Sequence, residues 1–184
     1  TSLNEKGQAA IICSQGILFR SGEEGKIRKN MILGDVKKDL QGDVIEGIIA
    51  LPSKLFFGTG IPGCILILNK NKPKERKNKI IFIYAAKEFK ELKNRNDLED
   101  AHVDHIIKKF KEFKDEDRYS HVADLKELEE NEYNLNVPRY VDISEPEKPI
   151  DIQKTINELQ KLEKESKEIE KKVNADLKEL GFKI

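Results

Sequence analysis

The sequence predicts an α/β fold: a mixed sheet with helices, followed by a long separate helix. Short runs of Ile, Val and Leu recur in the first half of the chain, each with the length of a buried strand rather than of a helix. A segment with helical spacing of apolar residues separates the first run from the second. Residues 150–180 then keep one helical pattern without Pro or Gly.

Composition limits the size of the fold and the ways in which it can bind a partner. The 184 residues are 37% charged and 38% hydrophobic, enough for one domain of modest core with an appendage. The formal net charge is zero, so any DNA contact must come from a local basic patch or from a partner. No signal peptide or membrane-length apolar run is present, which predicts a cytoplasmic protein. Cys13 and Cys64 lie in apolar runs and are expected to be buried free thiols.

The first elements form a strand, a helix and a second strand. Ala9–Cys13 is the first predicted strand, and Ile27 and Met31 mark the apolar face of the helix that follows. Val44–Leu51 is the second strand. This order favours a right-handed crossover and predicts that the two strands form a parallel pair.

The stretch from Asp43 to Lys70 carries the most information. A loop joins Val44–Leu51 to the strand Cys64–Leu68, and its Pro and Gly residues give it a specific shape. The loop also holds Phe56 and Phe57. These aromatics either cap the core or contact a ligand beyond the strand ends, where open α/β sheets bind their ligands.

A basic loop, Asn69–Lys79, precedes the next predicted strand, Ile80–Ala85. We expect this strand to pair antiparallel with Cys64–Leu68 as a hairpin. The loop either contacts phosphates or is a solvated loop that protects an edge strand. The candidate phosphate contacts are Lys70, Lys72, Lys74, Arg76 and Lys77.

From Lys87 the pattern is helical and highly charged. Leu98–Phe113 is an amphipathic helix, on which His102 and His105 have a spacing that can bridge a metal. No Cys or third His lies nearby, so we interpret both as part of a solvated face and predict no metal site. A short helix and an extended stretch follow within Ala123–Arg139, where Pro138 rules out a continuing helix.

The C-terminal helix carries an apolar seam with steps of three and four residues. Such a seam predicts pairing with another helix, either in a partner or antiparallel with Leu98–Phe113 in the same chain. The seam is formed by Ile156, Leu159, Leu162, Ile169, Val173, Leu177 and Leu180.

Four segments, in order across Gly7–Asp142, resemble a known family. They read GQAAIICSQGILFRSGEEGKIRKNMI, LPSKLFFGTGIPGCILILNK, KIIFIYAA and YNLNVPRYVD. Together they are similar to the C-terminal part of the modification (M) subunit of type I restriction-modification systems, which are N6-adenine DNA methyltransferases. The family's usual Leu-Pro-Asn/Asp-Gly turn is replaced here by Cys13-Ser14-Gln15-Gly16.

This resemblance implies a fold and a division into segments. The fold would be the C-terminal half of a Rossmann-like class I methyltransferase sheet, with parallel strands and an antiparallel hairpin, followed by a helical tail. The implied segments are a partial α/β core over residues 1–86, a helical extension with the YNLN-x-x-RY block over 87–142, a linker over 143–149 and a long helix over 150–184.

The resemblance also implies the chemistry. Family members use S-adenosylmethionine as methyl donor and stack the flipped adenine on an aromatic ring. Phe57 falls at that place, Phe56 is the second candidate, and Thr59 would shape the same pocket. No Gly-x-Gly-type turn follows the first predicted strand and no Pro-Pro pair is present, so we assign no catalytic residue. The chain alone is therefore expected to bind no S-adenosylmethionine and to be inactive.

The implied partners are DNA, the specificity (S) subunit and the restriction (R) subunit, with the C-terminal helix joining helices of the S subunit. Two alternatives stay open. The chain could be a stand-alone interaction module, or a fragment that complements a separate N-terminal chain. Half of a sheet exposes an apolar face and an open strand edge. Self-association in solution would therefore favour part of an M subunit or a complementing fragment, whereas a monomer would favour the stand-alone interaction module.

Overall fold

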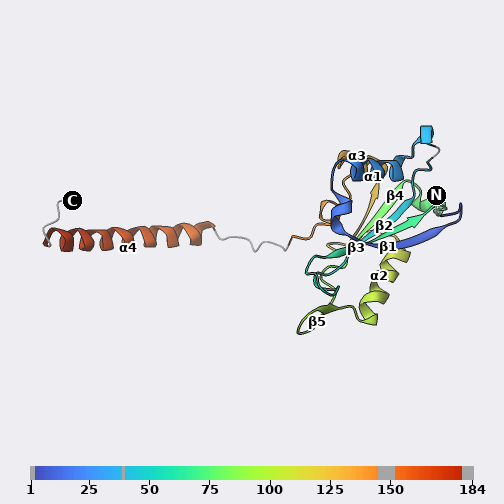
Figure 1. The fold of residues 1–184 in the computed structure, drawn as a ribbon. Coiled ribbons are helices and arrows are strands. Elements are labelled where there is room, and N and C mark those ends of the chain that lie inside the picture. Colours follow the sequence, from blue (N-terminus) through green and yellow to red (C-terminus); the bar gives the residue numbers. More distant parts are fainter. Residues whose placement is uncertain (1–2, 39, 145–151, 180–184) are drawn as a thin grey trace. The chain divides into compact units, whose positions relative to one another are not determined.

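The computed structural model describes residues 3–38, 40–144 and 152–179, and the chain divides into two compact units, Thr1–Ser144 and Glu145–Ile184. The first unit is an α/β domain built on a five-stranded sheet (Figure 1). The second contains one helix, α4, over Ile152–Glu179. No helix in the described part of the chain is long and apolar enough to span a membrane.

The sheet has the order β1-β3-β2-β4-β7. β3 pairs antiparallel with both β1 and β2, β2 pairs parallel with β4, and β4 pairs antiparallel with β7. β1 and β2 therefore run in the same direction, but the predicted parallel pair of these two strands is wrong, because β3 lies between them. The strands are β1 (Gln8–Ser14), β2 (Ile45–Ala50), β3 (Gly63–Asn69), β4 (Lys79–Tyr84) and β7 (Ser120–Asp124).

The predicted hairpin between the third and fourth strands is wrong. β2 lies between β3 and β4, so that Ile48 faces Leu66 on one side and Phe82 on the other. Every residue of β2 is buried, which fits a strand with neighbours on both sides and helices over both faces. The connection over residues 70–78 is long enough to pass one strand, and the loop after β2 makes the antiparallel β2–β3 pair instead.

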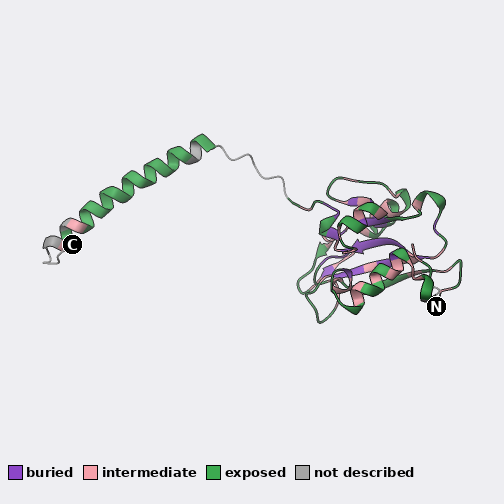
Figure 2. Cartoon of the chain, turned by 90° about the horizontal axis from the view of Figure 1, so that it is seen from above, coloured by how far each residue is buried: buried purple, intermediate pink, exposed green. Residues whose placement is uncertain are grey.

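Helices cover the two faces of the sheet. α1 (Glu23–Leu33) and α3 (Leu125–Glu130) contribute to the core on one face, and α2 (Asp100–Glu112) contributes to the core on the other (Figure 1). Buried residues are concentrated in the strands between these layers (Figure 2). The described residues of this unit also include short 3-10 helices: η1 (Gln15–Leu18), η2 (Val36–Lys38), η3 (Lys74–Arg76) and η4 (Val137–Arg139).

The YNLN-x-x-RY block packs across the α1 side of the sheet. Leu135 and Val137 are fully buried there, and the Tyr140 ring stacks on Phe82 with centroids 3.8 Å apart and an interplanar angle of 11°. The Tyr140 hydroxyl donates to the Asn134 carbonyl at 2.7 Å. The buried Tyr140 side chain therefore holds this block on the sheet, through its ring and through its bond to the backbone of the half-buried Asn134.

The segment from Lys87 is less helical than the charge pattern predicts. β5 (Lys90–Glu91) and β6 (Asn96–Asp97) form a small hairpin, and β7 joins the main sheet. Two-residue strands carry no alternation that a sequence pattern can detect. Because β7 pairs with β4, residues 87–142 belong to the same compact unit as the first four strands.

Candidate nucleic-acid interface

The loop over residues 51–62 leaves the carboxyl end of β2 and returns into β3. Its ends are joined by a hydrogen bond in which the Leu51 amide donates to the Gly63 carbonyl at 3.0 Å. Lys54 and Gly58 take φ values of 54° and 75°, which turn the backbone sharply. The Thr59 hydroxyl accepts from the Ile61 amide at 3.1 Å. The Thr59 side chain thus helps to shape the loop by holding the backbone of Ile61.

The two aromatics of this loop have different environments. Phe56 packs against the core on the α2 side, and a Cβ at Gly63 would lie only 2.9 Å from its Cε2 atom. Phe57 is 85% exposed. The sequence left two interpretations of these aromatics, that they cap the core or that they contact a ligand. Phe56 caps the core, whereas the Phe57 ring is accessible to a ligand.

The β5–β6 hairpin is anchored to this loop. The Asn96 amide donates to the Lys54 carbonyl at 2.9 Å, and its side-chain Nδ2 donates to the Ser53 carbonyl at 2.8 Å. Asn96 is 6% exposed. This anchor places the Arg95 guanidinium over the Phe57 ring, 4.9 Å from the centroid.

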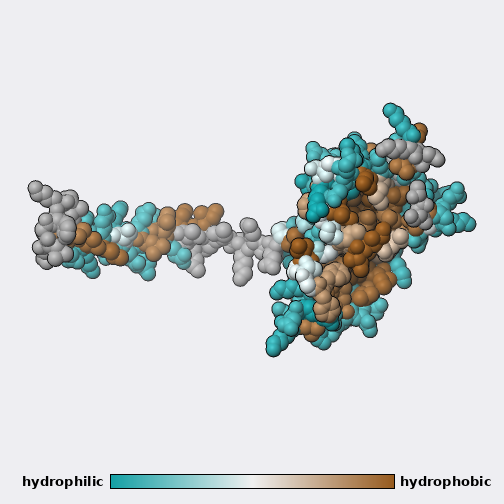
Figure 3. All heavy atoms as spheres, in the orientation of Figure 1, coloured by the Kyte–Doolittle hydropathy of each residue, from teal (hydrophilic) through white to brown (hydrophobic). Residues whose placement is uncertain are grey.

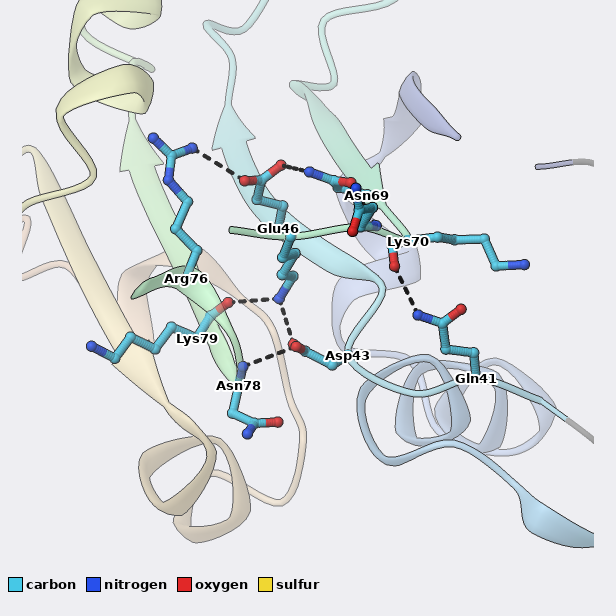
Figure 4. Close-up of polar contacts among 10 residues, drawn as sticks. Gln41, Asp43, Glu46, Asn69, Lys70, Arg76, Asn78 and Lys79 are labelled. Atoms are coloured by element: carbon cyan, nitrogen blue, oxygen red, sulfur yellow. Dashed lines mark hydrogen bonds and ion pairs between the residues drawn. The ribbon is translucent and has the colours of Figure 1, made fainter. Parts of the chain in front are cut away.

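Two cations of the basic loop are used inside the protein (Figure 4). Lys72 Nζ lies 2.5 Å from Asp43 Oδ1 and donates to the Lys79 carbonyl at 2.8 Å. Figure 4 labels these two acceptor residues, Asp43 and Lys79. Its side chain is 1% exposed. Burial lowers the pKa of Lys72, and the hydrogen bond and charge of Asp43 act against that shift.

The second internal cation is Arg76. Its Nη1 atom lies 3.1 Å from Glu46 Oε1, and the same carboxylate accepts from Asn69 Nδ2 at 2.9 Å (Figure 4). The guanidinium also lies over the Phe113 ring, 4.6 Å from its centroid. Because Lys72 and Arg76 are held by carboxylates, the candidate phosphate contacts that remain exposed are Lys74 and Lys77. Lys70 is half-buried, and its Nζ donates to the Leu3 carbonyl at 3.3 Å.

The structure does not bring the basic loop and Phe57 together. The Phe57 loop joins the end of β2 to the start of β3, whereas residues 70–78 join the end of β3 to the start of β4. Since β2 and β4 are parallel and β3 runs the other way, the two loops lie at opposite ends of the sheet. They are separated by about 20 Å, the length of a six-residue strand.

The residues present do not form a Rossmann-type cofactor turn. That turn joins a strand to a helix whose N-terminus faces the ligand. Gly58-x-Gly60-x-x-Gly63 has the spacing of the glycine motif, but it joins two strands. The strand-to-helix connection from β1 to α1 places Glu23 and Glu24 in the first helical turn, next to any bound carboxylate. We therefore derive no step through S-adenosylmethionine from these residues.

The three histidines make structural contacts. The His102 Nδ1 atom accepts from the Glu99 amide at 3.1 Å and so completes the cap of α2. His105 Nδ1 lies 2.5 Å from Glu88 and its ring stacks on Tyr119, while His121 contacts Glu127 at 2.8 Å. Within the described ranges, no group of three metal-ligating side chains could hold a metal ion.

Helix α4 presents its predicted seam as exposed apolar side chains, which Figure 3 shows along the helix. Leu177 is half-buried within its own unit. Leu180 lies outside the described residues, as does most of the predicted 143–149 linker. The exposed members of the seam are Ile156, Leu159, Leu162, Ile169 and Val173.

Sequence reasoning missed the groups that fix both loops. Asp43 and Glu46, which hold the two internal cations, flank or interrupt the apolar run of β2. A carboxylate inside a buried strand must be paired, so Glu46 was a signal that a cation would approach it. Asn96 and Arg95 gave no comparable signal, because they lie in a polar segment.

Residues 1–149 match the model of the N-6 DNA methylase family. Two curated relatives come from Methanocaldococcus jannaschii. The type I restriction enzyme MjaVII methylase subunit is 41% identical over 165 residues, which are 88% of this chain and 27% of that protein. The MjaVIII methylase subunit is 42% identical over 177 residues, 95% of this chain and 29% of the relative. The chain thus spans little more than a quarter of their length.

A solved structure gives the same result. The methyltransferase subunit of a type I restriction-modification system from Streptococcus thermophilus superposes with a TM-score of 0.64 at 40% identity, over 74% of this chain and 27% of that one. A protein from a study of the assembly of a type I restriction-modification system superposes over 96% of this chain with a TM-score of 0.53 at 14% identity, which shows a shared fold.

Proposed function

Because the chain belongs to the N-6 DNA methylase family and resembles the C-terminal part of type I modification subunits, we propose that it forms the target-base side of an adenine-N6 DNA methyltransferase. The observation that carries this proposal is Phe57. A ring that is 85% exposed at the tip of a shaped loop, beyond the carboxyl end of a parallel strand, is placed where α/β proteins bind ligands.

Phe57 would stack on the adenine after it leaves the duplex, with Phe56 behind it as support and Thr59 holding the turn. Base–aromatic stacking stabilises a bound base by about 1–3 kcal/mol. S-adenosylmethionine would supply the methyl group in the complete enzyme, from a site formed by residues other than those described here. The chain alone would then be inactive.

The exposed edge strand β1 supports the proposal that additional polypeptide packs against this domain in the complete enzyme. β1 has one partner strand among the described residues, and Ile11 and Ile12 are 44% and 61% exposed. Successive strand side chains point to opposite faces, so β1 lacks apolar cover on both. Figure 3 shows an apolar area where Figure 1 places β1 and β3. Additional strands and helices, in the same polypeptide or a complementing fragment, would cover this edge.

Helix α4 supports a protein partner. Its exposed seam has the spacing of a coiled coil, and its other residues, apart from Ile152, Ala175 and Leu177, are charged or polar. We propose that the seam pairs with helices of the specificity subunit, and that DNA and the restriction subunit complete the assembly. The exposed cations Lys74 and Lys77, together with the half-buried Lys70, are proposed phosphate contacts away from the target base. The second candidate, an interaction module without enzymatic role, rests on the same helix.

A chimera tests this function. In the MjaVII methylase subunit, the matched segment is replaced by this chain, and transfer of labelled methyl groups from S-adenosylmethionine to adenine in DNA is measured with the specificity subunit present. We expect activity, and a loss of roughly 5- to 150-fold in kcat/KM with Phe57→Ala. Val36→Ala, at a side chain that is 98% exposed, is the matched control and should have no effect. An inactive but folded and assembled chimera would support the interaction module instead.

A further inference from the structure

We propose that Arg95 is a positioning residue for the target nucleotide: its guanidinium covers one face of Phe57, so that the base stacks on the other face, and its remaining donors meet the phosphate of the same nucleotide. This inference rests on the proposed stacking role of Phe57. It assigns a specific function to the β5–β6 hairpin.

The hairpin is braced on two sides, so Arg95 has a defined place. On one side, Asn96 makes two hydrogen bonds to the backbone of the Phe57 loop, 2.9 and 2.8 Å long. On the other, Lys90 Nζ lies 2.6 Å from Glu99 Oε1, and the Glu99 side chain also caps α2. Within the hairpin the Leu92 amide donates to the Arg95 carbonyl at 2.8 Å.

The contact between Arg95 and Phe57 leaves both groups available. The guanidinium carbon is 4.9 Å from the ring centroid, a cation–π distance, yet Phe57 stays 85% exposed. Within the described ranges, the ion pair recorded for Arg95 is a 3.9 Å contact with Asp97, and the Arg95 side chain is 37% exposed. A guanidinium has five N–H donors, so several remain for a phosphate.

The arrangement of the Phe57 ring and the Arg95 guanidinium suits a nucleotide, which carries both a base and a phosphate. Because the Arg95 guanidinium lies over one face of the Phe57 ring, the ring offers its other face to a base. The planar guanidinium itself matches the oxygens of a phosphate. A ligand that carries both a base and a phosphate should therefore bind better than the same base without phosphate. The difference should depend on Arg95.

The test compares 2′-deoxyadenosine 5′-monophosphate with 2′-deoxyadenosine, using the whole chain and the NMR signals of the Phe57 ring. We expect both ligands to shift these signals, with the monophosphate binding roughly three- to tenfold more tightly. Arg95→Ala should reduce this ratio to about one. Arg95→Lys should restore it in part, because the charge returns without the planar group. Lys93→Ala, which removes an exposed cation from the same hairpin, should leave the ratio unchanged.

Each other result overturns a defined part of the proposal. A ratio that is unchanged in Arg95→Ala, or equally reduced in Lys93→Ala, overturns the role of Arg95 and leaves stacking on Phe57 intact. Tighter binding of deoxyadenosine to Arg95→Ala would show that the guanidinium occupies the face that the base needs. No Phe57 shift with either ligand overturns the stacking proposal and this inference together.

Discussion

Lys72 Nζ lies 2.5 Å from Asp43 Oδ1 at a position where the Lys72 side chain is 1% exposed. The other oxygen of Asp43 accepts from the Asn78 amide at 3.0 Å. This one carboxylate, two residues before β2, therefore contacts residues near both ends of the loop between β3 and β4. The pair links the segment before β2 to the loop between β3 and β4, and it occupies a lysine that the sequence presents as a DNA contact.

Asp43→Asn should destabilise the domain by about 3–5 kcal/mol, because it leaves the Lys72 ammonium buried without its counter-charge. Asn also tolerates the φ of 55° at this position, so backbone strain is not the cause. Chemical denaturation measures the change. Adding Lys72→Met should recover most of the loss, and Lys74→Ala, at an exposed cation of the same loop, should change stability by less than about 0.5 kcal/mol. A loss below about 1 kcal/mol in Asp43→Asn would contradict this role.

The two phenylalanines should separate stability from binding. Phe56→Ala should cost about 2–3 kcal/mol in the free energy of unfolding, because its ring packs on the α2-side core and against Gly63. Phe57→Ala removes a largely exposed ring and should cost less than about 0.5 kcal/mol. Thermal denaturation of the two variants measures both values. Equal losses would mean that Phe57 is also a core residue.

The two cysteines should differ in reactivity. Burial raises the pKa of the Cys64 thiol to about 11 from a usual value of 9.0, whereas Cys13 is only half-buried. At pH 8 an alkylating reagent should modify Cys13 first, because the reactive form is the thiolate. Between about pH 9 and 11 the unfolded chain ionises this thiol and the folded chain does not, so the Cys64 contribution to stability falls as pH rises. Mass spectrometry after timed labelling checks the order, and Cys64→Ala should remove the pH-dependent part. Faster labelling of Cys64 would contradict the order.

The seam of α4 should carry partner binding. Leu159→Lys with Leu162→Lys places two charges in the proposed helix–helix contact while keeping good helix formers. We expect binding to the specificity subunit, measured by calorimetry, to weaken at least about 100-fold, since each buried leucine is worth about 1.5–3 kcal/mol. Lys161→Ala between them is the control and should have little effect. Unchanged binding by the double variant would place the contact elsewhere.

The sequence predicts those parts of the fold that are coded by local patterns. The apolar runs predict β1 to β4, and helical spacing predicts α2 and α4, each within a few residues of its observed bounds. α1 and α3 are predicted as helices without exact bounds. The pairing of β4 depends on contacts distant in sequence. A single apolar run such as Ile80–Ala85 is compatible with either neighbour, and the completely buried β2 takes the central place.

The candidate site divides in the same way. Phe57 is identified from the loop and the family resemblance, but its exposure and its contact with Arg95 depend on how the hairpin folds back on the loop. Lys72 and Arg76 show the opposite case. In the sequence they are two members of a basic run, and only the folded chain brings them to Asp43 and Glu46.

The central claim is that this chain supplies the target-base side of a methylase and not its cofactor site. Calorimetry of the whole chain with S-adenosylmethionine tests it most directly, because the described residues contain no Rossmann-type turn from a strand into a receptive helix. We expect no heat of binding at ligand concentrations up to about 1 mM, a limit of about 4 kcal/mol in binding free energy. Saturable binding with a dissociation constant in the micromolar range would contradict the claim, and would mean that these residues form a cofactor site of another kind.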